Sequence, residues 1–424
     1  MAEQKTLGIL VGGGPAPGIN GVISSATIEA RNRGLRVLGF YEGFRWLMQE
    51  QPLEEGVHYR ELQIRDVTRI HVTGGSLLRT SRANPTRDKK LLKTVVRNLQ
   101  SLGVNYLLTI GGDDTAFSAS KVYEASGGEI AVVHVPKTID NDLPLPDYMP
   151  TFGFESARHL GTLLVQNLME DARTTQRWYI VVAMGREAGH LALGIGKAAG
   201  ATLTLIPEEF TEPPVDLGFV VDTIIGSYAK RKAEGRHYGV VVVAEGIAEK
   251  LDPESIETCG DLQRDEHGHL ILSEIPLGQI LKEAIERELA QLGIKSRWVE
   301  QEIGYVLRSA RPIAFDIEYT RNLGYGAIKF LLQGGTGAMI AFRRGMLHPL
   351  YFDDIMDPRT GRTRVRLVDT ESESYEVASH YMIRLRKDDF ENEDLVQAMA
   401  RALNMDRDAF VKRFKRVAVP ERGR

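Results

Sequence analysis

The chain has 424 residues, of which 43% are hydrophobic and 26% charged, and 53 Lys and Arg stand against 57 Asp and Glu for a formal net charge of -4. This length exceeds one compact core and predicts two or three domains. The nearly balanced charge excludes a nucleic-acid surface built on bulk positive charge, so a polyanion would need locally placed Lys and Arg.

Further features argue against export and against a membrane. No apolar stretch reaches membrane-spanning length, and no signal-peptide pattern follows Met1. The single cysteine, Cys259, excludes an intramolecular disulfide and agrees with a reducing compartment. We therefore expect a cytoplasmic protein that binds neither membrane nor nucleic acid.

Strand-like apolar runs alternate with amphipathic helical patterns up to about residue 345, which is typical of a doubly wound α/β protein. In the first third, strands are predicted at residues 6–11, 37–40, 106–110 and 130–135. Helices are predicted from about Pro17, over 89–102 and over 115–125.

Three prolines within residues 144–150 predict a domain crossing, and a second α/β block follows them. Its strands are predicted at 178–183, 202–206 and 239–244, and its helices at 155–172, 188–199, 216–234 and 276–292. A helix at 317–332 and a strand at 338–343 come next. The last 75 or so residues are charged and irregular in pattern, and we expect a cap or tail without recognisable chemistry.

Two acidic segments carry most of the chemical information. Residues 111–115, Gly-Gly-Asp-Asp-Thr, and 136–142, Pro-Lys-Thr-Ile-Asp-Asn-Asp, each follow an apolar run that is typical of a buried parallel strand. Loops at the carboxyl ends of parallel strands converge, and the helices after them point positive N-termini at the same edge. Aspartates there predict a divalent metal that bridges to phosphate, and phosphoryl transfer with magnesium is the first hypothesis.

Each motif has a plainer alternative. Asp114 could cap the helix over 115–125, a common role for Asp. Asp140 and Asp142 could be solvated, although an extended backbone would point both carboxylates the same way, with Lys137 alongside, as a base and a metal or orienting group. Arg186 could be an arginine at a sheet edge.

Similar polar residues follow two more predicted strands. Met184, Gly185 and Arg186 follow the strand at 178–183, and Glu245 follows the strand at 239–244. The glycine-rich segment 12–20 joins the first strand to a helix, where it is either a plain turn or a phosphate-binding loop. The recurrence of polar residues beside Gly or Thr at strand ends favours a shared site.

In order and spacing, segments 12–20, 111–114, 136–142, 184–186 and 244–246 resemble the phosphofructokinase family over roughly residues 5–345. The resemblance implies two Rossmann-like doubly wound domains with the active site in the cleft between them, and phosphorylation of fructose 6-phosphate at its 1-hydroxyl. The expected domains are a phosphoryl-donor domain over 1–150 with 305–345 returning, a fructose-6-phosphate domain over 151–304, and a C-terminal extension over 346–424.

The resemblance also implies roles for particular residues. Asp140 is similar to the base that takes the sugar hydroxyl proton, and Asp113 to the Mg²⁺ ligand. The donor would contact Gly13, Gly14, Arg82 and Lys137. The sugar phosphate would contact Thr138, Ile139, Asp142, Arg177, Met184, Gly185, Arg186, Glu245, Tyr305 and Arg308. Arg177 resembles an arginine that reaches across a subunit interface, which implies a homodimer or homotetramer.

Two departures from the ATP-dependent pattern concern the donor. ATP-dependent bacterial relatives typically have Gly in place of Asp114 and of Lys137. A carboxylate there fills and charges the path of a nucleotide, whereas a lysine suits a small anion such as pyrophosphate. The pair resembles the pyrophosphate-dependent branch, with an ATP-dependent phosphofructokinase as the alternative; Asp140 argues against a non-catalytic sugar-phosphate sensor.

Other positions depart from the family as well. Pro15 stands where many relatives have Asp, and Val299 where many have a basic substrate residue. Arg297 is the candidate substitute for that basic residue.

Overall fold

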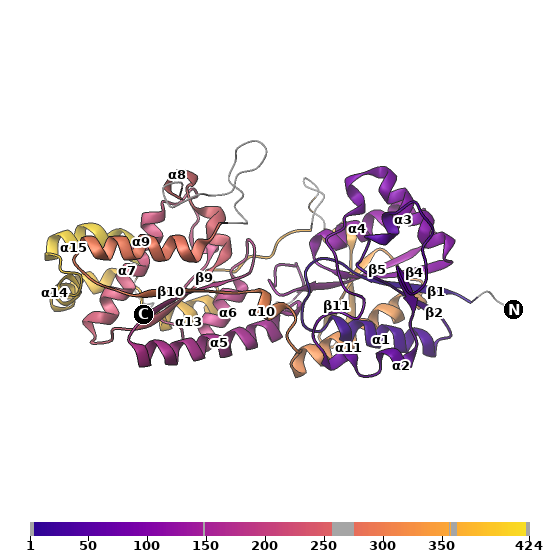
Figure 1. The fold of residues 1–424 in the computed structure, drawn as a ribbon, viewed down its shortest axis with the longest axis horizontal. Coiled ribbons are helices and arrows are strands. Elements are labelled where there is room, and N and C mark those ends of the chain that lie inside the picture. The colour runs from indigo at the N-terminus through magenta and orange to yellow at the C-terminus, as the bar shows by residue number, and fades with distance from the viewer. Residues whose placement is uncertain (1–3, 147–148, 257–274, 356, 358–362, 421–424) are drawn as a thin grey trace. The chain divides into compact units, whose positions relative to one another are not determined.

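A computed structural model describes residues 4–146, 149–256, 275–355, 357 and 363–420 (Figure 1). Cys259 lies outside the described residues. The chain divides into two compact units: unit 1 comprises Met1–Ala157 with Tyr305–Arg366, and unit 2 comprises Arg158–Gly304 with Leu367–Arg424. No helix of the described residues is both long and apolar enough to cross a membrane.

The sheet of unit 1 has the strand order β12-β11-β5-β4-β1-β2-β3, and β6 pairs with β5. Its strands are β1 (Thr6–Val11), β2 (Arg36–Phe40), β3 (Tyr59–Glu61), β4 (Val104–Gly111), β5 (Ala131–Thr138), β6 (Phe152–Gly153), β11 (Ala338–Arg343) and β12 (Met346–Tyr351). The pairs β2–β3 and β11–β12 are antiparallel, and the others are parallel. The ends of β1, β4 and β5 therefore lie at one edge.

Helices cover both faces of this sheet (Figure 1). Helices α1 (Ile19–Asn32) and α11 (Ala314–Leu332) lie on one face, and α3 (Lys89–Ser101) and α4 (Asp113–Ala125) on the other. Short helices α2 (Ile64–Val67), α10 (Tyr305–Arg308) and α12 (Phe352–Ile355) lie between longer elements. A Cβ atom on Gly21 of α1 would lie 2.2 Å from Oγ1 of Thr320, so this glycine permits the close packing of α1 on α11.

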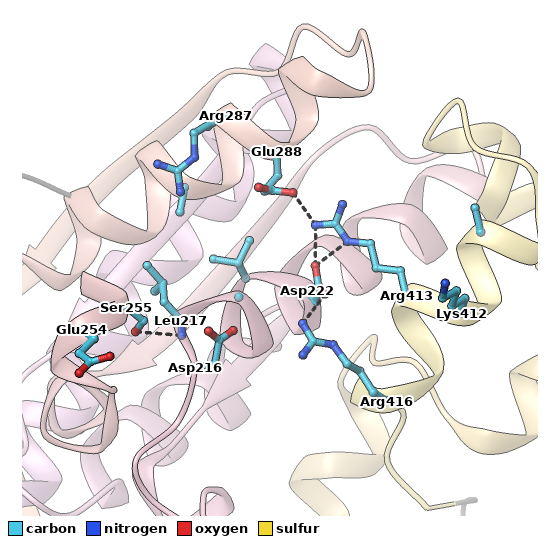
Figure 2. Close-up of a pocket in the computed structure, with 14 residues that line it drawn as sticks. Asp216, Leu217, Asp222, Glu254, Ser255, Arg287, Glu288, Lys412, Arg413 and Arg416 are labelled. Atoms are coloured by element: carbon cyan, nitrogen blue, oxygen red, sulfur yellow. Dashed lines mark hydrogen bonds and ion pairs between the residues drawn. The ribbon is translucent and has the colours of Figure 1, made fainter. Parts of the chain in front are cut away.

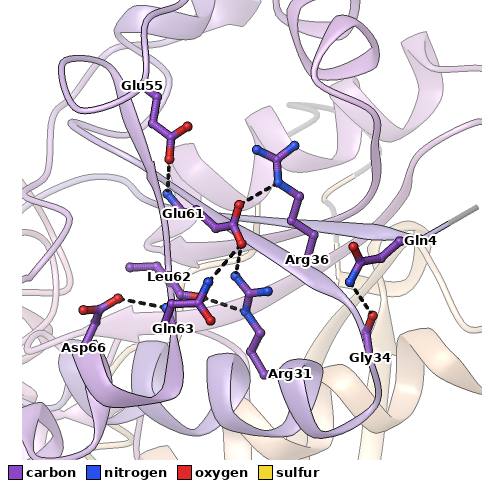
Figure 3. A network of polar contacts seen from close by, with 9 residues as sticks. All are labelled: Gln4, Arg31, Gly34, Arg36, Glu55, Glu61, Leu62, Gln63 and Asp66. Atoms are coloured by element: carbon purple, nitrogen blue, oxygen red, sulfur yellow. Dashed lines mark hydrogen bonds and ion pairs between the residues drawn. The ribbon is translucent and has the colours of Figure 1, made fainter.

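Polar contacts, rather than apolar alternation, hold the short strand β3. Figure 3 shows the Glu61 carboxylate accepting from Arg31 of α1 at 2.6 Å and from Arg36 of β2 at 2.9 Å. These contacts lower the pKa of Glu61, the hydrogen bond from Arg31 most strongly. A three-residue strand fixed by a carboxylate leaves no periodic pattern, which is why the sequence did not predict it.

Unit 2 has a fully parallel sheet of order β10-β7-β9-β8. The strands are β7 (Trp178–Ala183), β8 (Leu203–Leu205), β9 (Gly239–Ala244) and β10 (Trp298–Ile303). The helices are α5 (Phe154–Thr175), which begins in unit 1, α6 (His190–Ala199), α7 (Leu217–Ala233), α8 (Pro253–Ile256) and α9 (Leu277–Gln291). β10 was not predicted because its sequence, Trp-Val-Glu-Gln-Glu-Ile, is polar in its middle.

The segment expected to be an irregular tail contains regular structure, and that prediction was wrong in this respect. Its elements are β12 and α12 in unit 1, and α13 (Glu373–Tyr381), α14 (Glu393–Ala402) and α15 (Arg407–Phe414) in unit 2. Val396, Met399, Phe410 and Phe414 from α14 and α15 join the same core as Trp178 and Trp298. These helices were not predicted because they are short and many of their residues are charged, so the few apolar residues on the buried face gave no clear helical pattern.

Ion pairs attach α15 and the turn that follows it to α7 and α9. Figure 2 shows the Asp222 carboxylate of α7 between Arg413 and Arg416, with shortest distances of 2.7 and 2.8 Å. Arg413 also contacts Glu288 of α9 at 2.8 Å. The Asp222 side chain is only 4% exposed, so its charge depends on these two guanidinium groups.

We predict that Asp222→Asn lowers the stability of the protein by about 2 kcal/mol, because it leaves two arginines without their shared carboxylate. The measurement is the midpoint of thermal unfolding, which should fall by a few degrees. Glu254→Gln is the control, since Glu254 lines the pocket shown in Figure 2 together with Asp222 but is exposed. Equal midpoints for the two variants would contradict the prediction.

Candidate active site

Three loops of unit 1 meet at the carboxyl ends of β1, β4 and β5, as the sequence predicted. Thr115 of α4 lies against two of them: a Cβ atom on Gly12 would lie 2.4 Å from its Oγ1, and one on Gly111 would lie 2.3 Å from its Cβ. Gly12 also donates its backbone N–H to the carbonyl of Ile110 at 2.8 Å. Glycine is required at both positions because the loops approach so closely.

The loop after β1 is lined by cations. Lys137 is 4% exposed and donates from Nζ to the carbonyl of Gly14. Nη1 of Arg308 lies 3.4 Å from the position that a Cβ of Gly14 would take. The structure thus brings Lys137 and Arg308 to the same glycine, although the resemblance had implied a sugar-phosphate contact for Arg308.

A second segment runs along the same loop. Gly13 donates its N–H to the carbonyl of Ser81 at 2.9 Å, and Thr80 Oγ1 donates to the carbonyl of Gly13 at 2.5 Å. Arg82, which follows Ser81, is exposed. Gly13, Gly14 and Lys137 therefore lie together, and Arg82 adjoins them along the chain through Ser81. We call these four residues, together with Asp113, Asp114, Asp140 and Arg308, the unit 1 edge.

Asp113 and Asp114 form the first turn of α4, and the residue that caps this helix is Gly112. No side chain makes the cap hydrogen bond, so the alternative in which Asp114 caps a helix over 115–125 is wrong. Asp113 is half-buried and Asp114 is exposed. Both carboxylates lie at the positive end of the helix dipole, which favours negative charge there.

The loop after β5 buries Asp140 and turns sharply at the next residue. Asp140 is 8% exposed, and its N–H donates to Oγ1 of Thr138 at 3.0 Å. Asn141 has φ of 60°, in the left-handed region. The extended backbone that we assumed for Asp140 and Asp142 is therefore wrong, and the two-residue repeat of a strand does not relate their carboxylates.

His134 of β5 contacts the end of β4, and it was not identified from the sequence as part of the site. Its Nε2 lies 3.0 Å from the carbonyl of Gly111 and its Nδ1 lies 2.8 Å from Oγ1 of Thr109. A carbonyl can only accept, so Nε2 carries the proton and Nδ1 accepts from the threonine hydroxyl. Complete burial, with a smaller effect from Lys137, lowers the pKa of His134 to about 3. A lone histidine between valines in a strand was the available signal.

In unit 2, the loops after β7 and β9 meet at one edge. Glu245 Oε1 accepts from the N–H of Gly185 at 3.0 Å and of Arg186 at 2.7 Å. A Cβ atom on Gly246 would lie 2.1 Å from the carbonyl of Arg186. Glu245 therefore orders the loop that carries the exposed Arg186, a role that the sequence did not suggest.

Met184 lies in the same group, whereas Arg177 does not. A Cβ on Gly304, which follows β10, would lie 2.8 Å from Cε of Met184. Arg177 precedes β7, so the strand separates it from Arg186 by about 20 Å. Arg297 precedes the neighbouring β10, and its carbonyl accepts from the N–H of Trp178 at 3.3 Å. Arg177 and Arg297 thus lie together at the other edge of the sheet.

The unit 1 edge could hold magnesium only with help from a ligand. Across the described part of the chain, no three or more His, Cys, Asp or Glu side chains are grouped so that they could hold a metal ion. Mg²⁺ is commonly bound by one or two carboxylates together with phosphate oxygens and water. Asp113, beside a glycine loop with two neighbouring cations, fits such a partial site.

Known proteins resemble this chain over most of its length. The family described as Phosphofructokinase matches residues 6–331. The chain is 57% identical to "Pyrophosphate--fructose 6-phosphate 1-phosphotransferase" of Thermotoga maritima over 98% of both chains. It is 51% identical to a protein of the same name from Naegleria fowleri, over 97% of this chain and 95% of that one.

A solved structure shares the fold. The pyrophosphate-dependent phosphofructokinase of Marinobacter aquaeolei matches 95% of this chain and 92% of its own length, with a TM-score of 0.65 and 18% identity. The α/β fold with parallel-rich sheets is therefore confirmed.

We predict that acid destabilises the wild-type protein more than a His134→Gln variant. The folded-state pKa of about 3 lies below the ordinary 6.5, so His134 contributes fully above pH 6.5 and its contribution falls as the unfolded state gains a proton below it. The expected slope is at most about 1.4 kcal/mol per pH unit. Urea unfolding from pH 7.5 to 4.5 measures it.

The control for this experiment is His237→Gln, because His237 is exposed. Its unfolding free energy should follow that of the wild type at every pH. If the curves of the wild type and His134→Gln ran parallel as well, His134 would not be a neutral buried group.

Proposed function

Since this chain belongs to the phosphofructokinase family, we propose that it transfers a phosphoryl group from pyrophosphate to the 1-hydroxyl of fructose 6-phosphate. The products are fructose 1,6-bisphosphate and phosphate. Pyrophosphate and a sugar phosphate ester have similar transfer potentials, so the reaction is reversible and serves glycolysis or gluconeogenesis. The observation that carries the proposal is the unit 1 edge, where Lys137 lies under Gly14 and Asp114 is exposed at the start of α4.

The donor is held by the unit 1 edge in this proposal. Backbone N–H groups of Gly13 and Gly14 and the side chains of Arg82 and Lys137 contact the pyrophosphate oxygens. Magnesium bound through Asp113 would neutralise charge on the phosphates during transfer. Asp114 puts a carboxylate where a nucleotide would extend beyond the reacting phosphates.

Asp140 acts as the general base. Its carboxylate takes the proton of the 1-hydroxyl as that oxygen attacks the nearer phosphorus, and the bond from this phosphorus to the bridging oxygen breaks. Phosphate leaves with the electrons of that bond. Burial of Asp140 supports this role because a base shielded from water keeps a fixed direction.

The proposed contacts of the sugar phosphate are those that the family resemblance implies. Thr138, Ile139 and Asp142 adjoin the base; Met184, Gly185, Arg186 and Glu245 come from unit 2; Tyr305 and Arg308 complete the set. Arg177 precedes β7 and lies away from Arg186, so we assign it to the site of a neighbouring subunit. Arg297 lies beside Arg177 and substitutes for the basic substrate residue that many relatives have at the position of Val299. The enzyme is then a cytoplasmic homodimer or homotetramer.

The ATP-dependent alternative has weaker support. Two relatives that match nearly the whole of this chain, at 57% and 51% identity, are both named for pyrophosphate, whereas a relative named as ATP-dependent is 32% identical over 80% of this chain. An exposed Asp114 also adds repulsion against a longer polyanion.

We expect the wild-type enzyme to use magnesium pyrophosphate far better than ATP. Asp114→Gly should raise kcat/KM for ATP because it removes a side chain and a negative charge. Lys137→Ala should weaken the pyrophosphate reaction without creating ATP use. Steady-state kinetics with both donors on the three proteins tests this. A wild-type preference for ATP would refute the proposal, and no gain in Asp114→Gly would mean that another group excludes the nucleotide.

Asp140→Asn should lower kcat by about a hundred- to ten-thousand-fold while the affinity for fructose 6-phosphate stays nearly the same. The reason is that Asn keeps the shape of the side chain and loses the base. Turnover and equilibrium binding of the sugar phosphate are the two measurements. If the variant retained more than about half of its rate, a different group would be the base.

A further inference from the structure

Arg366 reaches the loop that carries Asp140 from a part of the chain beyond the family match, which ends at residue 331. Its Nε donates to the carbonyl of Asn141 at 3.0 Å, and its Nη1 donates to the carbonyl of Met149 at 2.9 Å. Its Nη2 donates to Oδ1 of Asn141. Its backbone N–H donates to the carbonyl of Asp142 at 2.7 Å.

These contacts act on the turn directly after the proposed base. Asn141 is 8% exposed and has φ of 60°, in the left-handed region that residues other than glycine adopt only where their surroundings hold them. Its Oδ1 also accepts from the N–H of Thr151 at 3.0 Å, and Thr151 Oγ1 donates to the carbonyl of Thr138 at 2.9 Å. The turn is therefore fixed on both sides, by Thr151 and by Arg366.

A guanidinium group is suited to this task. It presents its N–H donors in one rigid plane, so a single side chain can satisfy the carbonyl and the amide oxygen of Asn141 together with a third acceptor. A lysine in its place is a point charge that cannot hold the three acceptors in this arrangement.

We propose that Arg366 is a positioning residue for Asp140: by holding Asn141 in its left-handed conformation, it sets the direction of the Asp140 carboxylate. This inference rests on the proposed function, in which Asp140 is the base. Misdirection of a reacting group by about 1 Å can cost a hundred-fold in rate, so the effect belongs to kcat rather than to binding.

The test compares Arg366→Ala and Arg366→Lys with Arg364→Ala, a control two residues away whose side chain is exposed. We expect both Arg366 variants to lose about ten- to a hundred-fold in kcat, with a nearly unchanged KM for fructose 6-phosphate. Millimolar guanidinium should restore part of the kcat of Arg366→Ala, while equal sodium chloride should not. Arg364→Ala should behave as the wild type.

Hydrogen exchange of the backbone amides at 139–143 separates this inference from the proposed function, because it needs no turnover. Faster exchange in Arg366→Ala than in Arg364→Ala, with the loss of kcat, supports the positioning role. Unchanged exchange overturns it whether or not the enzyme is active. If the wild type is active and Arg366→Ala keeps its kcat, the inference is also overturned. The same holds if Arg366→Ala and Arg364→Ala lose kcat equally and guanidinium restores neither. A wild type inactive with pyrophosphate and with ATP refutes the proposed function and the catalytic part of the inference.

Discussion

Close contact of two glycine backbones with the side chain of Thr115 is the constraint on which the unit 1 edge depends. The loops after β1 and β4 can both lie against this side chain because Gly12 and Gly111 have none. The contact brings the glycine loop next to the start of α4, where the helix dipole and Asp113 are available. His134 fixes the carbonyl of Gly111 from the other side, so that the loop is held between two buried side chains.

Charge at this edge is balanced locally rather than by the whole chain. A protein with a net charge of -4 has no general attraction for a phosphate compound. Lys137 and Arg308 place two positive charges near Gly14, and Asp113 and Asp114 place two negative charges in the first turn of α4. A small, highly charged donor suits such a site because nearly all of its charge lies within reach of these groups.

Most of the framework could be predicted because it depends on local patterns. Continuous apolar runs reveal the buried parallel strands, and polar residues after them reveal the edge, as at Asp140 and Glu245. β3 escaped prediction because ion pairs of Glu61 hold it. The turn at Asn141 and its contact with Arg366 escaped for a different reason: they join residues 225 positions apart, and no periodicity reports such a contact.

The division of the chain has a consequence for the order in which it folds during synthesis. β5 ends at Thr138, but β11, its neighbour at Val133 and His134, begins only at Ala338, after the whole of β7, β8, β9 and β10. At ordinary rates of translation this delay lasts about 10 to 40 s. During that time Val133 and His134 of β5 lack their partner strand β11, and such an open edge is prone to pair with another chain. Newly made protein is therefore most vulnerable to aggregation while the ribosome is still translating the second unit, and a chaperone that covers this strand would act there.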